Sequence, residues 1–298
     1  MIDIPPLPPD APRTTAPVPL RFEDVTRDGR IVLESLPNAF TATVWRRILK
    51  GSETARAFRS QGIVPILARL RMEGTPGPFS ANAQVEADGT YRLVRAEDGR
   101  FLVEMWAELH APIGRTYGKT ERQGERSRVG RVYAEHVLTR PFAADGDRRV
   151  RSLDFPGAPV AEHTRAALPA FESIASIPEH ATPLEPAGRV DPTPTAFGIM
   201  HTDSNMHVNS LVYLRVFEEA ALRRFVAIGR GSSLLARTVD IAYRKPCFAG
   251  QTMRIVLQAF EAGARLGVAA TIVTEPDAKD ENLARAKPHA YVRMGFES

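Results

Sequence analysis

The sequence predicts an α+β protein made of two units in tandem, each a helix followed by antiparallel strands. Two widely separated segments carry apolar residues at the three- and four-residue spacing of an amphipathic helix, and β-prone runs separated by turn residues follow each segment. A stretch rich in proline lies between the two patterns. With 298 residues, the chain is long enough for two domains of ordinary size.

The composition is typical of a globular protein and excludes several other classes. Hydrophobic residues make up 43% of the chain and charged residues 25%, and no apolar run approaches the roughly 20 residues that span a bilayer. The first residues lack the basic start and apolar core of a signal peptide, so we expect a cytoplasmic protein without a membrane partner. The one cysteine excludes an internal disulfide and a cysteine-rich zinc site. Basic residues are interleaved with acids rather than gathered with aromatics, which argues against nucleic acid as a partner.

The first half of the chain is interpreted as a proline-rich extended arm over residues 1–19 and a domain over residues 20–142. A helix is predicted over Asn38–Ser60, with an interruption near Gly51. Asp88-Gly89 is a hairpin turn signal between two short β-prone runs. The predicted strands of this domain are Ile63–Met72, Ser80–Val85, Tyr91–Val94, Phe101–His110 and Val129–Leu138.

The second half is interpreted as a proline-rich linker over residues 143–194 and a second domain over residues 195–298. The helix of this domain is predicted over Ser210–Ile228, because its apolar residues form one stripe and Gly229 provides the usual C-terminal stop. Four strands at the spacing of an antiparallel meander follow the helix. They are predicted over Leu234–Tyr243, Thr252–Ala259, Leu266–Thr274 and Lys287–Phe296.

The candidate functional residues lie in the loop that leads into the second helix. Asp203, Asn205, His207 and Asn209 occupy alternate positions there. A carboxylate can activate water or attack a carbonyl, an imidazole can exchange protons near neutrality, and free N–H groups at a helix start can stabilise an oxyanion. The structural alternatives are that Asp203 stabilises the loop, that Asn205 belongs to a turn, and that Asn209 caps the helix.

The pattern D-x-N-x-H-V-N, followed by a helix with Tyr213 and the run Glu218-Glu219-Ala220, resembles the hot-dog-fold thioesterases. The resemblance is strongest to the acyl-ACP thioesterases, whose chains carry two hot-dog domains in tandem. It implies a tandem (double) hot-dog, each domain an antiparallel sheet wrapped around a central helix, with no metal and no bound cofactor. The residues that it implies are Asp203, Asn205 and His207 for catalysis and Asn209, Ser210 and Tyr213 for substrate binding.

The sequence departs from this family pattern at three positions. Ser210 replaces the second Asn of the common H-V-N-N, and Met206 stands where many relatives have Gly. Pro246 replaces the Glu of the family run Tyr-Arg-Arg-Glu-Cys, which aligns with Tyr243-Arg244-Lys245-Pro246-Cys247. Cys247 keeps the cysteine of this run, and it is either a thiol nucleophile or a small buried hydrophobe. The first domain has no Asp or His at matching spacing before its helix, so we expect it to be non-catalytic.

The resemblance predicts a thioesterase that hydrolyses an acyl thioester of coenzyme A or of acyl carrier protein. Asp203 would activate water or form an acyl intermediate, and backbone N–H groups near Asn209 and Ser210 would hold the oxyanion. Two alternatives remain open, a non-hydrolytic acyl-thioester-binding or carrier-docking protein and an acyl-thioester dehydratase or hydratase. The net charge of +4 fits either an acidic partner or an ordinary solvated surface, and a homodimer is one assembly that the sequence leaves open.

Overall fold

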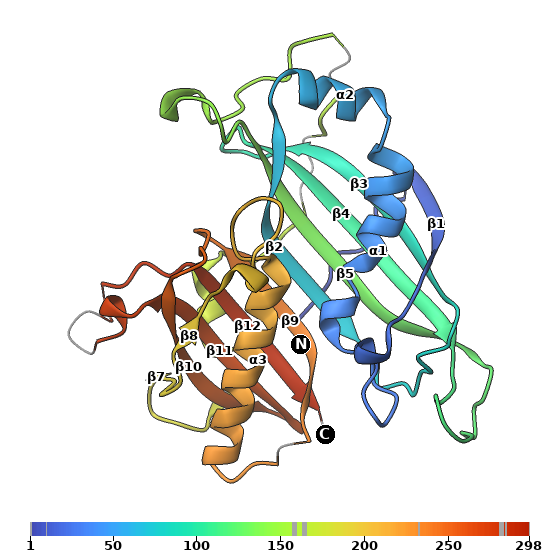
Figure 1. Cartoon of the computed structure of the whole chain (residues 1–298), viewed down its shortest axis with the longest axis vertical. Helices are drawn as coiled ribbons and strands as arrows, with labels where there is room; N and C mark the ends of the chain where they lie inside the picture. The colour runs from blue at the N-terminus through green and yellow to red at the C-terminus, as the bar shows by residue number, and fades with distance from the viewer. Residues whose placement is uncertain are drawn as a thin grey trace. The chain divides into compact units, whose positions relative to one another are not determined.

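The computed structural model describes residues 2–9, 11–156, 160–162, 166–231, 233–279, 283 and 285–297. The chain divides into two compact units, Asp3–Ala167 and Leu168–Ser298, and Ile2 groups with the second. Each unit places a helix against one face of an antiparallel sheet (Figure 1). The predicted α+β tandem hot-dog architecture is therefore confirmed. The division between the units falls inside the segment that was interpreted as a linker.

The N-terminal unit contains a five-stranded antiparallel sheet. Its strands follow the order β1-β3-β4-β5-β2, with every neighbouring pair antiparallel. Strand β1 lies within the proline-rich arm and pairs with β3, so this part of the arm completes the edge of the sheet. The strands are β1 (Arg13–Val18), β2 (Val64–Gly74), β3 (Val85–Arg95), β4 (Phe101–Pro112) and β5 (Arg126–Thr139).

The predicted helix of this unit forms in three consecutive pieces, and its interruption near Gly51 is confirmed. Gly51 adopts a φ of 78°, which favours glycine, and the next piece starts where the Ser52 hydroxyl accepts a bond from Ala55 N at 3.1 Å. The pieces are α1 (Asn38–Phe40), the π-helix η3 (Thr41–Leu49) and α2 (Glu53–Ser60). Short 3-10 turns flank the sheet at η1 (Phe22–Asp24), η2 (Leu33–Ser35) and η4 (Asp145–Asp147).

The hairpin turn predicted at Asp88-Gly89 is wrong, because β3 runs through both residues without a break. A Cβ atom at position 89 would lie 2.5 Å from Thr43 Cβ and closer still to the Thr43 hydroxyl. Gly89 is thus required where the Thr43 side chain of η3 packs on the sheet, and this close packing, rather than a turn, explains the glycine in the sequence. The actual hairpin turn spans Ala96–Arg100, with Gly99 at a φ of 77°.

Buried charges lie on the opposite face of the same sheet. Glu104 accepts hydrogen bonds from Arg92 Nε and Tyr133 OH, both at 2.7 Å, and from Ala166 N at 3.1 Å. Trp106 packs edge-on against Tyr133 and donates its Nε1–H to Pro5 O at 3.0 Å. The arm around Pro5 and the chain around Ala166 therefore shield these polar groups from water, and each group keeps a partner.

The C-terminal unit packs helix α3 (Ser210–Ala227) against a sheet in the order β9-β12-β11-β10. The four strands were predicted with short boundary errors, but the simple meander was wrong because β9 pairs with β12. Three short strands, β6, β7 and β8, pair with the outer edge of β10. They lie in the segment that is interpreted as a linker, and each is only two residues long, which is too short to give a periodic signal in the sequence. The strands are β6 (Thr182–Pro183), β7 (Arg189–Val190), β8 (Thr195–Ala196), β9 (Leu235–Tyr243), β10 (Thr252–Ala262), β11 (Arg265–Thr274) and β12 (Ala290–Glu297).

The predicted apolar stripe of α3 is confirmed, since four of its five members are buried and the fifth, Val216, is half-buried. The buried members are Tyr213, Phe217, Ala220 and Phe225. Phe225 packs edge-on against Phe296 of β12, with the ring centroids 5.1 Å apart. The remaining short turns of this unit are η5 (Glu172–Ala175), η6 (Ile199–His201) and η7 (Pro276–Ala278). Leu214 and Ala221 are buried as well, so one side of the helix lies in the core.

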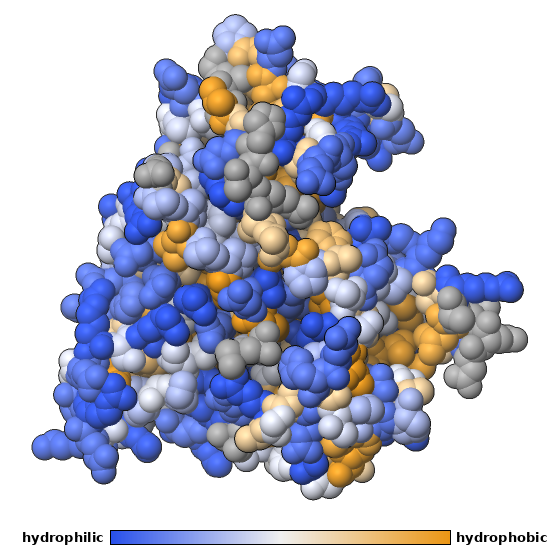
Figure 2. Space-filling model, turned by 180° about the vertical axis from the view of Figure 1, so that it is seen from behind, coloured by the Kyte–Doolittle hydropathy of each residue, from blue (hydrophilic) through white to orange (hydrophobic). Residues whose placement is uncertain are grey.

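Polar side chains cover much of the face seen in Figure 2, with smaller groups of apolar side chains between them. Over the described part of the chain, each helix is too short or too polar to cross a membrane. We expect the stability of the protein to depend mainly on how well each helix packs on its sheet.

Replacing Gly89 tests the close approach of η3 to β3. Gly89→Ala should lower the free energy of unfolding by about 1–3 kcal/mol, because the new methyl group overlaps Thr43, whose hydroxyl is held by Ala39 O at 2.6 Å. Gly146→Ala is the matched control, since nothing lies within 4 Å of its Cβ position. Urea denaturation of both variants measures the difference, and equal stabilities would contradict the packing described here.

Candidate active site

Residues 202–208 form a tight hairpin-like loop that returns the chain to the start of α3. A β-bridge joins Thr202 to Val208, Asp203 N donates to His207 O at 3.2 Å, and Met206 N donates to Asp203 O at 2.9 Å. Met206 adopts a φ of 64°, a conformation that glycine reaches without strain. The loop therefore keeps the backbone conformation of a glycine position although methionine occupies it.

The carboxylate of Asp203 is held in place by two donors of the same loop. Its Oδ1 accepts a bond from Asn205 N at 2.8 Å, and its Oδ2 accepts one from Asn209 Nδ2 at 3.2 Å. A carboxylate has about four lone-pair sites, so each oxygen keeps one further direction for an acceptor bond. The arrangement stabilises the loop and also fixes the orientation of the carboxylate. The side chain of Asn205 is exposed.

Asn209 caps α3, as the sequence had left open. Its Oδ1 accepts from Leu211 N at 2.9 Å, and its own N–H donates to His201 O at 2.9 Å. The N–H of Asn209 is therefore not free to hold an oxyanion. Among the described residues, the N–H of Ser210 has no acceptor in the protein, so it is the donor of the helix start that remains available.

His207 is half-buried, and its hydrogen bond defines which ring nitrogen is free. Its Nδ1 lies 3.2 Å from Val208 O, and a carbonyl oxygen can only accept, so Nδ1 carries the proton of the neutral ring. The lone pair of Nε2 is then available to take a proton. The neighbouring His201 has the opposite tautomer, because its Nδ1 accepts from Gly198 N at 2.9 Å.

The side chains of Cys247 and Tyr213 lie in the core, 0% and 2% exposed. Tyr213 OH accepts from Cys247 N at 2.8 Å, so this tyrosine, expected at the substrate, holds the connection between β9 and β10. Burial disfavours the charged form of each group, so it raises the pKa of the Cys247 thiol and lowers the pKa of His289. The Nδ1 atom of His289 lies 3.4 Å from the Sγ atom of Cys247. That same Nδ1 donates to Pro246 O at 3.0 Å, so it cannot take the thiol proton.

His289 was not found from the sequence, because 42 residues separate it from Cys247. Apolar side chains beside the loop were also missed. Ile199 and Met200 are each 85% exposed, and they immediately precede His201. Exposed Met206 lies at the tip of the loop itself. Polar groups of the loop are therefore flanked by apolar surface that could contact an apolar ligand.

An apolar pocket of about 480 Å³ lies in the N-terminal unit, between its helices and its sheet. Trp45 and Phe58 line it from the helices, and Leu93 and Val103 line it from β3 and β4. Its volume falls in the range of about 300–1,000 Å³ that small-molecule sites occupy. Among the described residues, His, Cys, Asp and Glu form no group of three or more that could hold a metal ion.

Comparison with known proteins shows the fold of the chain. No family model and no curated protein matches the sequence. A putative oleoyl thioesterase of Lactobacillus plantarum is 14% identical with a TM-score of 0.62, covering 97% of this chain and 96% of that one. A 12:0-ACP thioesterase of Umbellularia californica is 10% identical with a TM-score of 0.57, covering 96% and 97%. A MaoC-like dehydratase of Phytophthora capsici is 12% identical with a TM-score of 0.54, covering 97% and 96%.

These similarities extend over nearly the whole chain, so the resemblance to the hot-dog thioesterases is confirmed at the level of the fold. A thioesterase and a dehydratase share this fold at similar TM-scores. The fold alone therefore does not select a reaction, and the function has to be argued from the residues of the site.

Removing the cap tests the role of Asn209. Asn209→Ala should lower the free energy of unfolding by about 1–2 kcal/mol, because it removes the bonds to Leu211 N and to Asp203. Asn209→Ser should lose less, since serine also caps helices well. Urea denaturation measures both, and Asn205→Ala, at an exposed side chain of the same loop, is the control. A cap role is ruled out if the two alanine variants have the same stability.

The burial of Cys247 predicts an unreactive thiol. At pH 8, the native protein should react with a thiol reagent at least about a hundredfold more slowly than the urea-unfolded chain, because access is blocked and the raised pKa reduces the thiolate fraction. The absorbance of the released reagent anion follows the reaction. A native rate close to the unfolded rate would instead indicate an accessible, activated cysteine.

Proposed function

We propose that this protein hydrolyses acyl thioesters carried on coenzyme A or on acyl carrier protein. The observation that carries this proposal is that one short segment, residues 203–210, carries three suitable groups: an oriented carboxylate on Asp203, a free Nε2 on His207 and a free N–H on Ser210. Together they provide a group that can act on water, a group that can transfer protons and a donor for an oxyanion.

In the proposed reaction, water bound to a free lone pair of Asp203 attacks the carbonyl carbon of the thioester. The water proton passes to the carboxylate or to His207 Nε2, and the oxyanion is stabilised by Ser210 N–H. The C–S bond then breaks, the leaving thiolate takes up the proton, and a free acid and a thiol are released. In the alternative mechanism, Asp203 attacks the carbonyl carbon itself, the C–S bond breaks and the thiolate leaves, which gives a mixed anhydride. Water then hydrolyses the anhydride to the free acid and the restored Asp203 carboxylate, and the proton released in this step protonates the thiolate.

Apolar surface beside the loop supports an acyl group as part of the substrate. The exposed side chains of Ile199 and Met200 provide this apolar surface next to the candidate site. Cys247 is left out of the mechanism because it is buried with a raised pKa and lacks a base at Nδ1 of His289.

Hydrolysis tests this proposal directly. Release of free thiol is measured from acyl-CoA and acyl-ACP substrates of several chain lengths. Asp203→Ala should lower kcat/KM by about a hundredfold or more, the effect expected for loss of a general base. Cys247→Ala should retain near wild-type activity, and so should Ser204→Ala, the matched control at an exposed neighbour of Asp203. Thermal melting confirms that each variant is folded.

Other results would select the other interpretations. Binding of acyl thioesters without thiol release would make the protein a non-hydrolytic acyl-binding protein. Hydration of 2-enoyl thioesters without hydrolysis would make it a hydratase. For an active hydrolase, single turnover in ¹⁸O-water separates the two mechanisms, because only nucleophilic attack by Asp203 leaves the label in its own carboxylate.

A further inference from the structure

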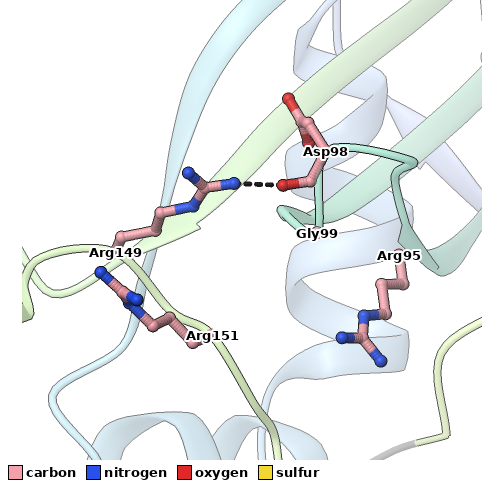
Figure 3. A pocket seen from close by; sticks show the side chains of 5 residues that line it. All are labelled: Arg95, Asp98, Gly99, Arg149 and Arg151. Carbon is pink, nitrogen blue, oxygen red and sulfur yellow. Dashed lines mark hydrogen bonds between the residues drawn. The ribbon is translucent and has the colours of Figure 1, made fainter.

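A second pocket, of about 320 Å³, lies at the hairpin that joins β3 to β4. It is lined by three arginines, Arg95, Arg149 and Arg151, together with Asp98 and Gly99 of the hairpin turn. Figure 3 shows Arg149 and Arg151 on one side of this pocket, on the segment that follows β5, and Arg95 on the other, at the end of β3. We refer to these three side chains as the arginine cluster.

The chain holds the arginine cluster in place through its backbone. A β-bridge joins Arg149 to Thr139 at the end of β5, and Arg140 N donates to Arg148 O at 2.8 Å. Val150, between the two arginines, is buried at 1% exposure. Because side chains alternate along an extended chain, burying Val150 turns Arg149 and Arg151 to the same side.

Arg95 is supported from the opposite side of the pocket. Its guanidinium stacks 5.6 Å from the ring centroid of Phe101, its cross-strand partner in β4. Its backbone N–H donates to Glu162 O at 2.8 Å. Stacking on an aromatic ring restricts the arginine while leaving its N–H groups free to donate.

The charge of the cluster is only partly neutralised within the protein, because the Asp98 carboxylate interacts electrostatically with Arg149. Arg149 donates to the main-chain oxygen of Asp98, which is uncharged, whereas the Asp98 carboxylate is bound by Arg100 at 2.6 Å. Among the described residues, none of the three guanidinium groups of the cluster forms an ion pair with a carboxylate. Three arginines and one carboxylate line the pocket, so a net positive charge remains that favours an anion there, and planar guanidinium groups fit phosphate oxygens especially well.

The same face of β3 connects this pocket to the apolar one. Tyr91 and Leu93 line the apolar pocket, and Arg95, two residues further on, lines the cationic pocket. Alternate residues of a strand share one face of the sheet. A ligand with an apolar part and a phosphate would match this sequence of surfaces.

We propose that the arginine cluster binds a phosphate ester of the ligand that carries the acyl group. This identification of the ligand rests on the proposed function. The phosphate can come from two sources, the nucleotide end of coenzyme A or the phosphopantetheine arm of a carrier protein. Both present phosphate oxygens to which arginine N–H groups donate.

Calorimetric titration of the full chain with coenzyme A at low salt tests the site. Arg151→Gln should weaken binding about tenfold, the loss expected for one charge-assisted hydrogen bond. Arg95→Gln, on the other side of the pocket, should do the same. Arg148→Gln is the matched control, because it removes an equal charge from the same segment but pairs with Asp145 and lies outside the pocket. We expect it to change the dissociation constant less than about twofold.

Two further ligands distinguish the sources. The 3′-phosphate lies in the pocket if the wild type binds dephospho-coenzyme A more weakly than coenzyme A and Arg151→Gln binds dephospho-coenzyme A as well as the wild type does. The phosphate of the phosphopantetheine arm lies in the pocket if Arg151→Gln weakens the binding of 4′-phosphopantetheine as much as it weakens the binding of coenzyme A. The proposal is overturned if neither coenzyme A nor phosphopantetheine binds, or if Arg148→Gln and Arg151→Gln weaken binding equally.

An acyl N-acetylcysteamine thioester separates this proposal from the proposed function. It contains no phosphate, so wild type and Arg151→Gln should hydrolyse it at the same rate. If it and the other thioesters are not hydrolysed while coenzyme A binding still depends on Arg151, the hydrolase function fails and the phosphate site stands. If the N-acetylcysteamine thioester is hydrolysed but the arginine variants bind coenzyme A as well as the wild type does, the proposed phosphate site is wrong and the hydrolase function stands.

Discussion

Asn209 uses both ends of its side-chain amide at the point where the loop becomes a helix. The oxygen accepts from Leu211 N and the nitrogen donates to Asp203, while the backbone N–H binds His201 O. One residue thereby joins the helix start, the carboxylate and the preceding turn. The candidate site depends on this connection, because an unattached carboxylate on a surface loop would have no defined direction relative to the helix N–H groups.

The capping role of Asn209 also limits which N–H groups of the helix start are free to bind a substrate. A helix start has four N–H groups without intrahelical partners, but here the loop and the cap satisfy some of them. Ser210 N–H is left as the available donor, and the hydrogen bond of His207 Nδ1 to Val208 O leaves Nε2 as the free nitrogen. The same local bonds that stabilise the loop therefore determine which atoms can take part in a reaction.

The two units carry different parts of the proposed function. The loop with Asp203 and His207 belongs to the C-terminal unit, and the apolar and cationic pockets belong to the N-terminal unit. A hot-dog unit without the polar loop can still offer a surface between its helix and its sheet. Our proposals assign the phosphate site to the first unit and the hydrolytic groups to the second.

The helix start at Ser210, its apolar stripe and most of the strands could be predicted from the sequence, because each depends on the spacing of neighbouring residues. The candidate loop could be predicted for the same reason, with all of its polar residues within seven positions. Gly89 was misread because the same residue type serves tight turns and close approaches, and the approach of Thr43 depends on a segment 46 positions earlier.

The pairing of β9 with β12, the contact of Cys247 with His289 and the gathering of Arg95 with Arg149 and Arg151 were decided only by the tertiary structure. Each joins residues that are more than forty positions apart. Local spacing determines which face of an element is apolar, but it carries no information about which distant element covers that face. Long-range packing of the sheet makes that choice, and with it the pockets and the free charges of this protein.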